Sequence, residues 1–381
     1  MLAATFAGRR AHALAARSAN GIAGDLDVAA RAALKAGACP GIALQIARHG
    51  QTLYAKPYGW SNLETDTPVA AGSVFRIGSI TKQFTAALVV KLAAQGRLSL
   101  DAPAAAYLPF FPDDRPFTVR ELLNHTAGLH DGETPCPCGS ATAKSQLDLA
   151  RDIAAQKKLF DFAPGTAWLY SNTNYVVLGA VVEKVTGLPL AEAAASIVFR
   201  PLGLPATAFD TVEAVVPGRV DGYSPVDGKP GTFAHAAYID VAQAGGAGAV
   251  RSDTGDLCRW HHALFANRLF DAGHVRLMTT PGRLRDGRPS GSHRFSPADD
   301  RAYGDVQYGM GFLLPPPVDG HRSVMHYGFI DGFAGCLETY PDQGLTLAIL
   351  CNADMGPGIA EAFRDLRRIV RKKLLPASAA P

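Results

Sequence analysis

One segment of this chain is predicted to be a helix that is apolar almost all the way round. It covers residues 79–95, and Gly96 is the natural stop after it. Its apolar side chains fall on most of the helix circumference: Phe84, Ala86, Ala87, Leu88, Val89, Val90, Leu92 and Ala93. A helix without a polar face is stable only when other elements surround it. We therefore place this segment at the centre of the fold.

Strand-like runs stand at both ends of the chain. The N-terminal pair, 42–48 and 51–58, is joined by a His-Gly turn signal. Four more runs lie near the C-terminus: 308–314, 322–326, 333–340 and 345–352. The links 328–332 and 341–344 are too short for anything but antiparallel neighbours. The last run is apolar on both faces, which predicts a sheet that is covered on both sides.

The middle of the chain is predicted to be mainly helical. The candidate helices are separated by Pro and Gly; they are 118–124, 145–156, 175–186, 190–199 and 254–265. A polar stretch over 281–301 is expected to be a surface loop, and a final helix is expected from about 358 to 375. The predicted fold is of the α/β class, α+β type. An antiparallel sheet domain from 25–80 and 306–381 is flanked by helices, and 81–305 forms a mainly helical second domain.

Composition limits the partners that the chain can have. Its 381 residues include 37 Lys and Arg against 34 Asp and Glu, a formal net charge of +3. This charge is too small to indicate a nucleic acid or an anionic membrane surface as partner. No run approaches the ~18 apolar residues that a membrane span needs. A small-molecule substrate is the expected partner, and the oligomeric state stays open.

The first 24 residues leave the location of the protein open. They contain no acidic residue, three arginines and no continuous apolar segment of the kind that a secretory signal needs. An organellar transit peptide, a mis-set start and an ordinary first helix all fit this composition. Cytoplasmic location is the default expectation, with periplasmic and organellar locations as alternatives.

The six cysteines are not predicted to form a disulfide framework or a zinc site. Cys336 and Cys351 fall inside apolar runs, where a cysteine acts as a small buried hydrophobe. Cys136 and Cys138 flank Pro137, and this two-residue step is not the usual zinc spacing. No metal and no cofactor is predicted.

The motif with the clearest chemistry is Ser79-Ile80-Thr81-Lys82, the only Ser-x-x-Lys in the chain. A serine hydroxyl is a weak nucleophile and needs a base within hydrogen-bond reach, and positions three apart share one face of a helix. At the helix start, free backbone N–H groups beside Ser79 suit an oxyanion. Lys82 can accept a proton only with a pKa about 3 below its ordinary ~10.4, at a cost of roughly 4 kcal/mol. About one such motif is expected by chance, so its place at the start of a buried helix is what singles it out.

A second motif, Tyr170-Ser171-Asn172, could complete a site around Ser79. A phenol can relay a proton between serine, lysine and leaving group, and an amide can orient both a lysine and a substrate carbonyl. The structural alternative is a turn with a packed tyrosine.

The third motif is His326-Tyr327-Gly328, at the end of an apolar strand. The strand edge could supply an oxyanion N–H from Phe329, and Gly328 would let a substrate backbone approach closely. His326 could hydrogen-bond Tyr170 or the substrate, whereas the alternative is a satisfied core histidine.

Other candidate residues are assigned to structure. His125 is expected to hydrogen-bond nearby backbone, and Arg76 is expected to pair with a carboxylate in the core. His261 and His262, on a predicted helix, are expected to be partly exposed.

With these three motifs in this order, the chain resembles the superfamily of serine β-lactamases and penicillin-binding proteins. The similarity is to the branch of class C β-lactamases, D-aminopeptidases, D,D-carboxypeptidases and related esterases, and it runs from about Pro40 to Asn352. Further segments carry it: FRIGSITKQFT at 75–85, LLNHTAGL at 122–129, PGT at 164–166 and GG at 245–246 ahead of Ser252.

The resemblance implies a β-lactamase/transpeptidase-like fold and a role for each motif. It makes Ser79 the nucleophile, Lys82 and Tyr170 the proton-transfer pair, and Asn172 a residue that orients the substrate. It also makes the backbone N–H groups of Ser79 and Phe329 an oxyanion hole, with no metal required.

The third motif departs from the β-lactamase pattern. His326 stands where class C β-lactamases carry lysine, and Tyr327 replaces a small hydroxyl residue. A mostly neutral histidine beside a bulky phenol should hold a β-lactam carboxylate less well, so efficient β-lactamase activity is not expected.

The leading hypothesis is a serine hydrolase that forms an acyl-enzyme on Ser79. It would cleave an amide or peptide bond, with D-residues as one option, or a small ester. A carboxylesterase or acyltransferase on the same fold is the alternative, and a true β-lactamase or a non-catalytic ligand sensor is less favoured. A sensor has no need of a costly neutral lysine, so the intact set of Ser79, Lys82 and Tyr170 argues against it.

Overall fold

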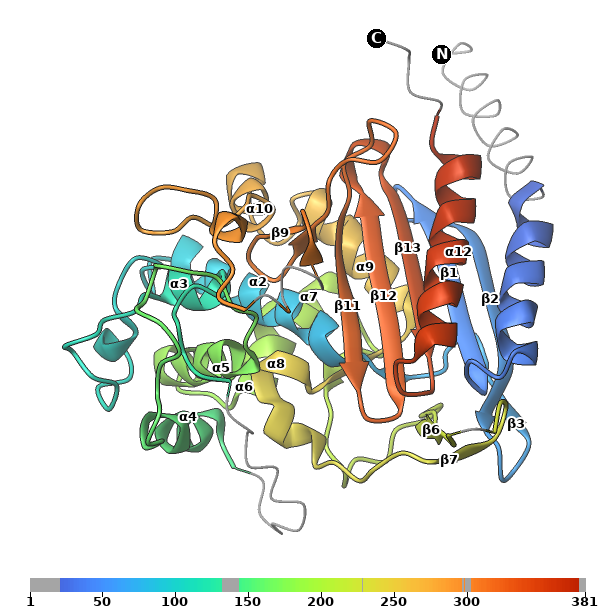
Figure 1. The fold of residues 1–381 in the computed structure, drawn as a ribbon, viewed down its shortest axis with the longest axis horizontal. Coiled ribbons are helices and arrows are strands. Elements are labelled where there is room, and N and C mark those ends of the chain that lie inside the picture. Colours follow the sequence, from blue (N-terminus) through green and yellow to red (C-terminus); the bar gives the residue numbers. More distant parts are fainter. Residues whose placement is uncertain (1–20, 132–143, 228, 297, 299–302, 377–381) are drawn as a thin grey trace.

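A long antiparallel sheet and a lobe of helices make up the molecule (Figure 1). The computed structural model describes residues 21–131, 144–227, 229–296, 298 and 303–376. Within them, eight strands form the sheet in the order β3-β2-β1-β13-β12-β11-β10-β9. The two ends of the chain meet at the antiparallel β1–β13 pair. The predicted fold class, a sheet made from both chain ends and flanked by helices, is confirmed.

Both faces of the sheet are covered. Its strands are β1 (Gly41–Arg48), β2 (Gln51–Asn62), β3 (Thr67–Pro68), β9 (Gln307–Tyr308), β10 (Leu313–Leu314), β11 (Val324–Ile330), β12 (Phe333–Tyr340) and β13 (Leu345–Cys351). Every residue of β12 and β13 is buried. Leu347 and Ile349 share a cluster with the helix over 21–35 and with α12 (Pro357–Leu374), which lie side by side on one face (Figure 1). Alternate residues of β13 point to the other face, where α9 (Thr254–Phe265) packs.

Two strand predictions need correction. The run 308–314 is not one strand but folds back on itself as β9 and β10, with Leu313 paired to Tyr308. The turn between them contains Gly311, whose φ of 81° suits glycine and where a Cβ would lie 2.8 Å from the Lys82 carbonyl oxygen. Strand β11 continues past the predicted 322–326, so Gly328 lies inside a strand rather than in a turn.

The predicted central helix is α2 (Thr81–Ala94), which is buried continuously from Thr81 to Val90. Around it lie α3 (Val119–Leu123), α4 (Gln146–Ala154), α5 (Asn172–Thr186), α6 (Leu190–Ala194), α7 (Arg200–Leu202), α8 (Gly245–Gly248), α9 and α10 (Ala272–Met278). Helix α5 begins three residues earlier than 175–186 predicts. The predicted helix 190–199 is α6 followed by a π-helical turn, Ala195–Phe199.

A small sheet, β4-β8-β5, links the helical lobe to the large sheet. It consists of β4 (Phe75–Arg76), β8 (Val250–Ser252) and β5 (Ala208–Phe209). A hairpin of β6 (Tyr223–Pro225) and β7 (Phe233–His235) lies between β5 and β8 in the chain. Strand β4 leads into the segment that carries Ser79, and β8 follows α8 directly. These strands could not be predicted from the sequence, because two or three residues show no periodicity.

The structure describes only some of the residues to which the predictions on the N-terminus and the cysteines refer. Residues 1–20, Cys136 and Cys138 lie outside them. Cys336 and Cys351 are buried, as predicted. Among the described residues, no helix has the length and apolar character needed to cross a membrane. The same ranges hold no cluster of three or more His, Cys, Asp or Glu side chains placed to bind a metal ion.

Candidate active site

Ser79 lies on a short 3-10 turn, Gly78–Ile80, immediately before α2 begins. Its side chain is half-buried, while its two neighbours are buried. Gly78 has a φ of 49°, and a Cβ there would come within 2.6 Å of both the backbone N and O of Phe329. Glycine is therefore required at this position, because it lets strand β11 contact the turn through backbone alone.

Gly328 serves the same contact from the strand side. A Cβ at Gly328 would lie 1.8 Å from the carbonyl oxygen of Ile77. We expected Gly328 to let a substrate backbone approach closely. In the structure, the backbone of Ile77 occupies that space instead. Ile330 pairs with Phe333 across the hairpin turn, so in the alternating antiparallel pattern Phe329 points its N–H away from β12. This N–H faces the nucleophile turn, where an oxyanion would lie.

Lys82, one helical turn after Ser79, is fully buried. Its Nζ lies 3.0 Å from Ser79 Oγ, 2.7 Å from Asn172 Oδ1 and 2.9 Å from the Ala247 carbonyl oxygen. Burial lowers the pKa of Lys82 to about 7, and the negative charge of Asp131 opposes this shift. The amine is thus held against the serine hydroxyl and loses its proton near neutral pH.

Tyr170, two residues before α5, also lies against the amine of Lys82. Its ring centroid is 4.8 Å from Lys82 Nζ. Burial raises the pKa of Tyr170 well above 10, and a hydrogen bond with Ser79 opposes that rise. The phenol therefore stays protonated at neutral pH and can donate a proton, while Lys82 is the group able to accept one.

His326 lies behind this group and is 2 % exposed. Its Nε2 is 3.1 Å from Tyr308 Oη, and its Nδ1 contacts the carbonyl oxygen of Tyr327. Its ring is 6.1 Å from that of Tyr170, and the hydrogen bond that we expected between the two is absent from the described contacts. Burial, with the charge of Lys82, lowers the pKa of His326 to about 3, so the ring is neutral.

Tyr327 points away from the site. Its hydroxyl accepts a hydrogen bond of 2.6 Å from Arg367 Nη1 on α12. The bulky phenol beside His326 therefore contacts α12 and not the candidate site.

His125 stabilises the backbone around the second motif, as predicted. Its Nδ1 accepts a hydrogen bond of 3.2 Å from Ser171 N and lies 3.1 Å from Asn174 Nδ2. Its ring is 4.5 Å from that of Tyr170 and 4.6 Å from that of Tyr308. Sequence reasoning missed Tyr308 because the run that contains it was interpreted as one plain strand.

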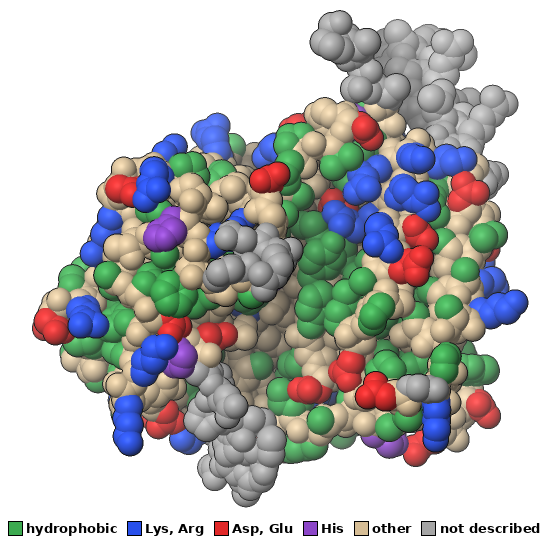
Figure 2. All heavy atoms as spheres, in the orientation of Figure 1, with side chains coloured by type: hydrophobic (Ala, Val, Ile, Leu, Met, Phe, Trp, Pro, Cys, Tyr) green, Lys and Arg blue, Asp and Glu red, His purple; other side chains and the backbone are tan. Residues whose placement is uncertain are grey.

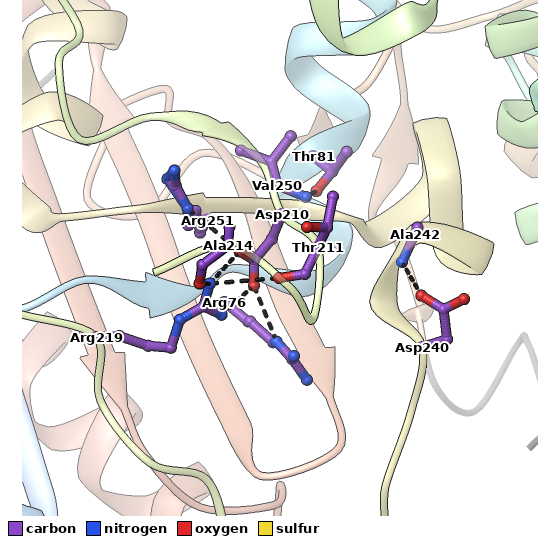
Figure 3. Close-up of polar contacts among 10 residues, drawn as sticks. All are labelled: Arg76, Thr81, Asp210, Thr211, Ala214, Arg219, Asp240, Ala242, Val250 and Arg251. Atoms are coloured by element: carbon purple, nitrogen blue, oxygen red, sulfur yellow. Dashed lines mark hydrogen bonds and ion pairs between the residues drawn. The ribbon is translucent and has the colours of Figure 1, made fainter. Parts of the chain in front are cut away.

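Arg76 pairs with a carboxylate, as predicted, but as one of three arginines that share it (Figure 3). Asp210, whose side chain is fully buried, lies 3.2 Å from Arg76 Nε, 2.6 Å from Arg219 Nη1 and 3.2 Å from Arg251 Nε. The cluster joins β4, β8 and the residue after β5, so it secures the small sheet beside Ser79.

The prediction for His261 is wrong. The side chain is fully buried rather than partly exposed. Its Nδ1 lies 2.6 Å from Thr339 Oγ1 and its Nε2 lies 2.8 Å from Gln83 Oε1, so it bridges α9 to β12 and α2. His262 is half-buried. The sequence pattern of the helix could not show that both ring nitrogens of His261 would have hydrogen-bond partners in the core.

A pocket of about 560 Å³ lies beside Ser79. The residues that line it come from α5, the 239–248 segment, the β11–β12 hairpin and the segment after β13, together with Asp131. They are Asp131, Asn172, Val176, Ile239, Gln243, Ala244, Ala247, Gly248, Phe329, Ile330, Asp331, Asp354 and Met355. Ser79, Asn172 and Phe329 thus line one cavity. Lys82 is hydrogen-bonded to both Ser79 and Asn172, and the ring of Tyr170 lies against the Lys82 amine. Gly328 and His326 support this arrangement from behind.

The fold agrees with the comparisons with known proteins. The chain belongs to the beta-lactamase family, which it matches over residues 26–371. The relationship predicted from the three motifs is therefore confirmed, as is the enzyme class, a hydrolase.

Three similar proteins show the breadth of the family. Penicillin-binding protein 4* of Bacillus subtilis (strain 168) is 28% identical over 322 residues, which are 81% of this chain and 67% of that protein. Esterase EstB of Burkholderia gladioli is 34% identical over 210 residues, 50% of this chain and 53% of the esterase. A D-stereospecific amidohydrolase from Streptomyces sp. superposes with a TM-score of 0.73 at 28% identity, covering 92% of this chain and 98% of that one. The chain thus aligns with only about half of the esterase.

Proposed function

We propose that this chain is a serine hydrolase that forms an acyl-enzyme on Ser79 and cleaves an amide or peptide bond, or a small ester. The observation that carries the proposal is the fully buried amine of Lys82, 3.0 Å from Ser79 Oγ. Its pKa of about 7 leaves much of it uncharged near neutral pH. An uncharged amine can accept the proton of the Ser79 hydroxyl and so generate the nucleophile.

The acylation step divides the proton transfers between Lys82 and Tyr170. The oxygen of Ser79 attacks the carbonyl carbon of the substrate, and its proton passes to Nζ of Lys82. The N–H groups of Ser79 and Phe329 stabilise the oxyanion. Tyr170 gives its phenolic proton to the leaving nitrogen or oxygen as that bond breaks, and it regains a proton from Lys82. Water then attacks the acyl-serine in the same way and releases the carboxylic acid.

The substrate class follows from the relatives and from the third motif. The similarity to a D-stereospecific amidohydrolase and to an esterase supports amide or ester cleavage. A neutral His326 at the position of the class C lysine supplies no cation for a β-lactam carboxylate. Asn172, bonded to Lys82, is positioned to orient the substrate carbonyl.

Covalent labelling tests the proposal directly. A fluorophosphonate should react with the folded protein, and the adduct should lie on the tryptic peptide 77–82, which contains Ser79. Protein unfolded in urea is the control and should not react, because the activating lysine is then dispersed. An adduct on another peptide, or equal labelling of the unfolded chain, would remove Ser79 as the nucleophile.

The pH dependence of turnover should follow the ionisation of Lys82. The base must be uncharged, so kcat/KM should rise about tenfold per pH unit below pH 7 and level off above it. Tyr170 stays protonated in this range, so no fall is expected before strongly alkaline pH. Asp131→Asn removes the charge that raises the pKa of Lys82 and should move the inflexion to lower pH. A flat profile from pH 5 to pH 9 in both proteins would contradict the assignment of Lys82 as base.

A further inference from the structure

Another cavity, of about 210 Å³, lies against strands β4 and β8 of the small sheet. Arg76, Arg219 and Arg251 line it. Among the described residues, the one carboxylate with which these arginines form ion pairs is Asp210, whose side chain is fully buried. Three positive charges thus surround a single negative charge. A cluster with such an excess of positive charge attracts an anion.

Arg76 and Arg251 stand directly opposite each other in the antiparallel pairing of β4 with β8. Side chains at paired positions of neighbouring strands lie on the same face of a sheet, where two like charges are destabilising. The Nε atoms of both arginines lie 3.2 Å from the carboxylate of Asp210, which they share with Arg219 (Figure 3). The charge of one carboxylate is therefore divided among three guanidinium groups.

These two arginines leave most of their hydrogen-bond donors unused. Arg76 donates from Nε to Asp210, and the side chain of Arg251 donates no hydrogen bond to any residue that the structure describes. Their side chains are only 18 % and 19 % exposed, so water has limited access to them. Arg219, by contrast, bonds both oxygens of Asp210 and two backbone carbonyl oxygens. Guanidinium groups with free N–H groups match the oxygens of an oxyanion.

The other carboxylates of the cavity do not neutralise this cluster. Asp221 accepts a hydrogen bond from Asn62, and Asp331 is exposed at the tip of the β11–β12 hairpin. In the described part of the chain, neither of them forms an ion pair with an arginine. Much of the remaining wall is apolar, with Val220 and Ile239 as examples. The cavity therefore has room for an anion that carries a small apolar group.

We propose that this cavity binds a phosphate group through the guanidinium groups of Arg76 and Arg251. A phosphate brings up to two negative charges and several strong acceptor oxygens, which offset the excess charge and pair with the unused N–H groups. The site is separate from the pocket beside Ser79. The two cavities share Ile239 and Asp331 in their walls, but Ser79 lines only the other one.

Thermal unfolding in the presence of inorganic phosphate tests this proposal. A ligand that binds only the folded protein raises Tm, so about 20 mM phosphate should raise it by about 2–4 °C over chloride at equal ionic strength. Phosphate also stabilises proteins through its exclusion from their surface, and this effect keeps growing with concentration. Binding in the cavity should instead saturate, and titration calorimetry should detect it. A shift that does not saturate, together with no binding heat, would overturn the proposal.

Variants distinguish binding in the cavity from a general response to charge. Arg251→Gln should abolish the saturable shift. Arg364→Gln removes the same charge from the exposed face of α12, over which Figure 2 shows basic side chains gathered, and should retain the shift. An equal saturable shift in the parent and in Arg251→Gln would contradict the assignment.

A second pair of variants decides the outcome if Arg251→Gln does not fold. Ala237 lines the cavity and is exposed, so its replacement should leave the fold intact. Ala237→Glu places a carboxylate beside the arginines and should raise the half-saturating phosphate concentration at least about tenfold. Ala237→Gln has nearly the same size without the charge and should change it by less than about threefold. Equal half-saturation in these two variants would place the phosphate elsewhere.

Free phosphate and a phosphate monoester share the chemistry that the arginines recognise. Phenyl phosphate separates the two sources, because its ring would contact Val220 and Ile239. Half-saturation at a lower concentration than inorganic phosphate assigns the cavity to a monoester, and half-saturation at a higher one assigns it to the free ion.

The proposed phosphate site does not depend on the proposed catalytic role of Ser79. Ser79→Ala should therefore show the same phosphate-dependent shift in Tm as the parent, whether or not Ser79 is the nucleophile. Loss of the shift in this variant would mean that phosphate binds in the catalytic pocket, and the cavity of the three arginines would no longer be its site.

Discussion

Replacement of Ser79 by alanine is expected to lower kcat by about 10⁴-fold or more. Lys82 would keep its contacts with Asn172 and Ala247, so the fold should survive, but no oxygen would remain to attack the substrate. The N–H of Phe329 and the pocket would still bind and polarise a carbonyl, which leaves only the weak residual catalysis of a site without a nucleophile. Covalent labelling of peptide 77–82 should disappear altogether.

The measurement is turnover of a nitrophenyl ester or an aminoacyl amide, with circular dichroism to verify the fold. Ser99→Ala is a matched control, because Ser99 is an exposed serine outside the pocket. It should keep full activity and full labelling. Retained turnover in Ser79→Ala would show that another group attacks the substrate, and the acyl-enzyme mechanism would have to be abandoned.

The sequence predicted best those helices and strands whose apolar pattern and length allow only one kind of element. The segment that contains α2 has no polar face, so it could only be central, and it is buried continuously from Thr81 to Val90. The predicted strand 333–340 and the predicted helix 254–265 agree with β12 and α9 residue for residue. In each of these, length and apolar pattern indicate the same element, so nothing in the tertiary structure had to override the local preference.

The candidate site was only partly accessible from the sequence. Ser79, Lys82, Tyr170 and Asn172 could be singled out because their side chains carry recognisable chemistry. The carbonyl oxygen of Ala247, which accepts a hydrogen bond from Lys82, has no signature, since every residue has such an oxygen. Which groups meet there depends on the packing of α8 against α2.

The glycines and aromatic residues around the site show the same limit. We predicted that a substrate would lie against Gly328, because any backbone can approach a glycine at a strand edge. Only the fold shows that the backbone of Ile77 fills this space. Tyr308 became a partner of His326 through a tight turn at Gly311 that pattern analysis treated as strand. Contacts between segments far apart in the sequence decide these details.

Replacement of Asp210 by asparagine is expected to destabilise the protein by about 3–5 kcal/mol. Asp210 is the one carboxylate that Arg76, Arg219 and Arg251 share, and its side chain is fully buried (Figure 3). Asparagine has nearly the same shape but no charge, and its NH₂ would face a guanidinium. Three partly buried cations would then repel one another with no anion between them.

Urea denaturation measures this loss, and Asp286→Asn is the matched control. Asp286 pairs with Arg288 at the surface, where solvent screens the pair, so its replacement should leave the free energy of unfolding almost unchanged. The Asp210 cluster also holds β4, which leads into the Ser79 turn, and β8, which follows the helix that provides Ala247 O. Under conditions where Asp210→Asn is still folded, the fluorophosphonate should therefore label Ser79 more slowly than in the parent. Unchanged stability together with an unchanged labelling rate would mean that the cluster secures neither the small sheet nor the catalytic turn.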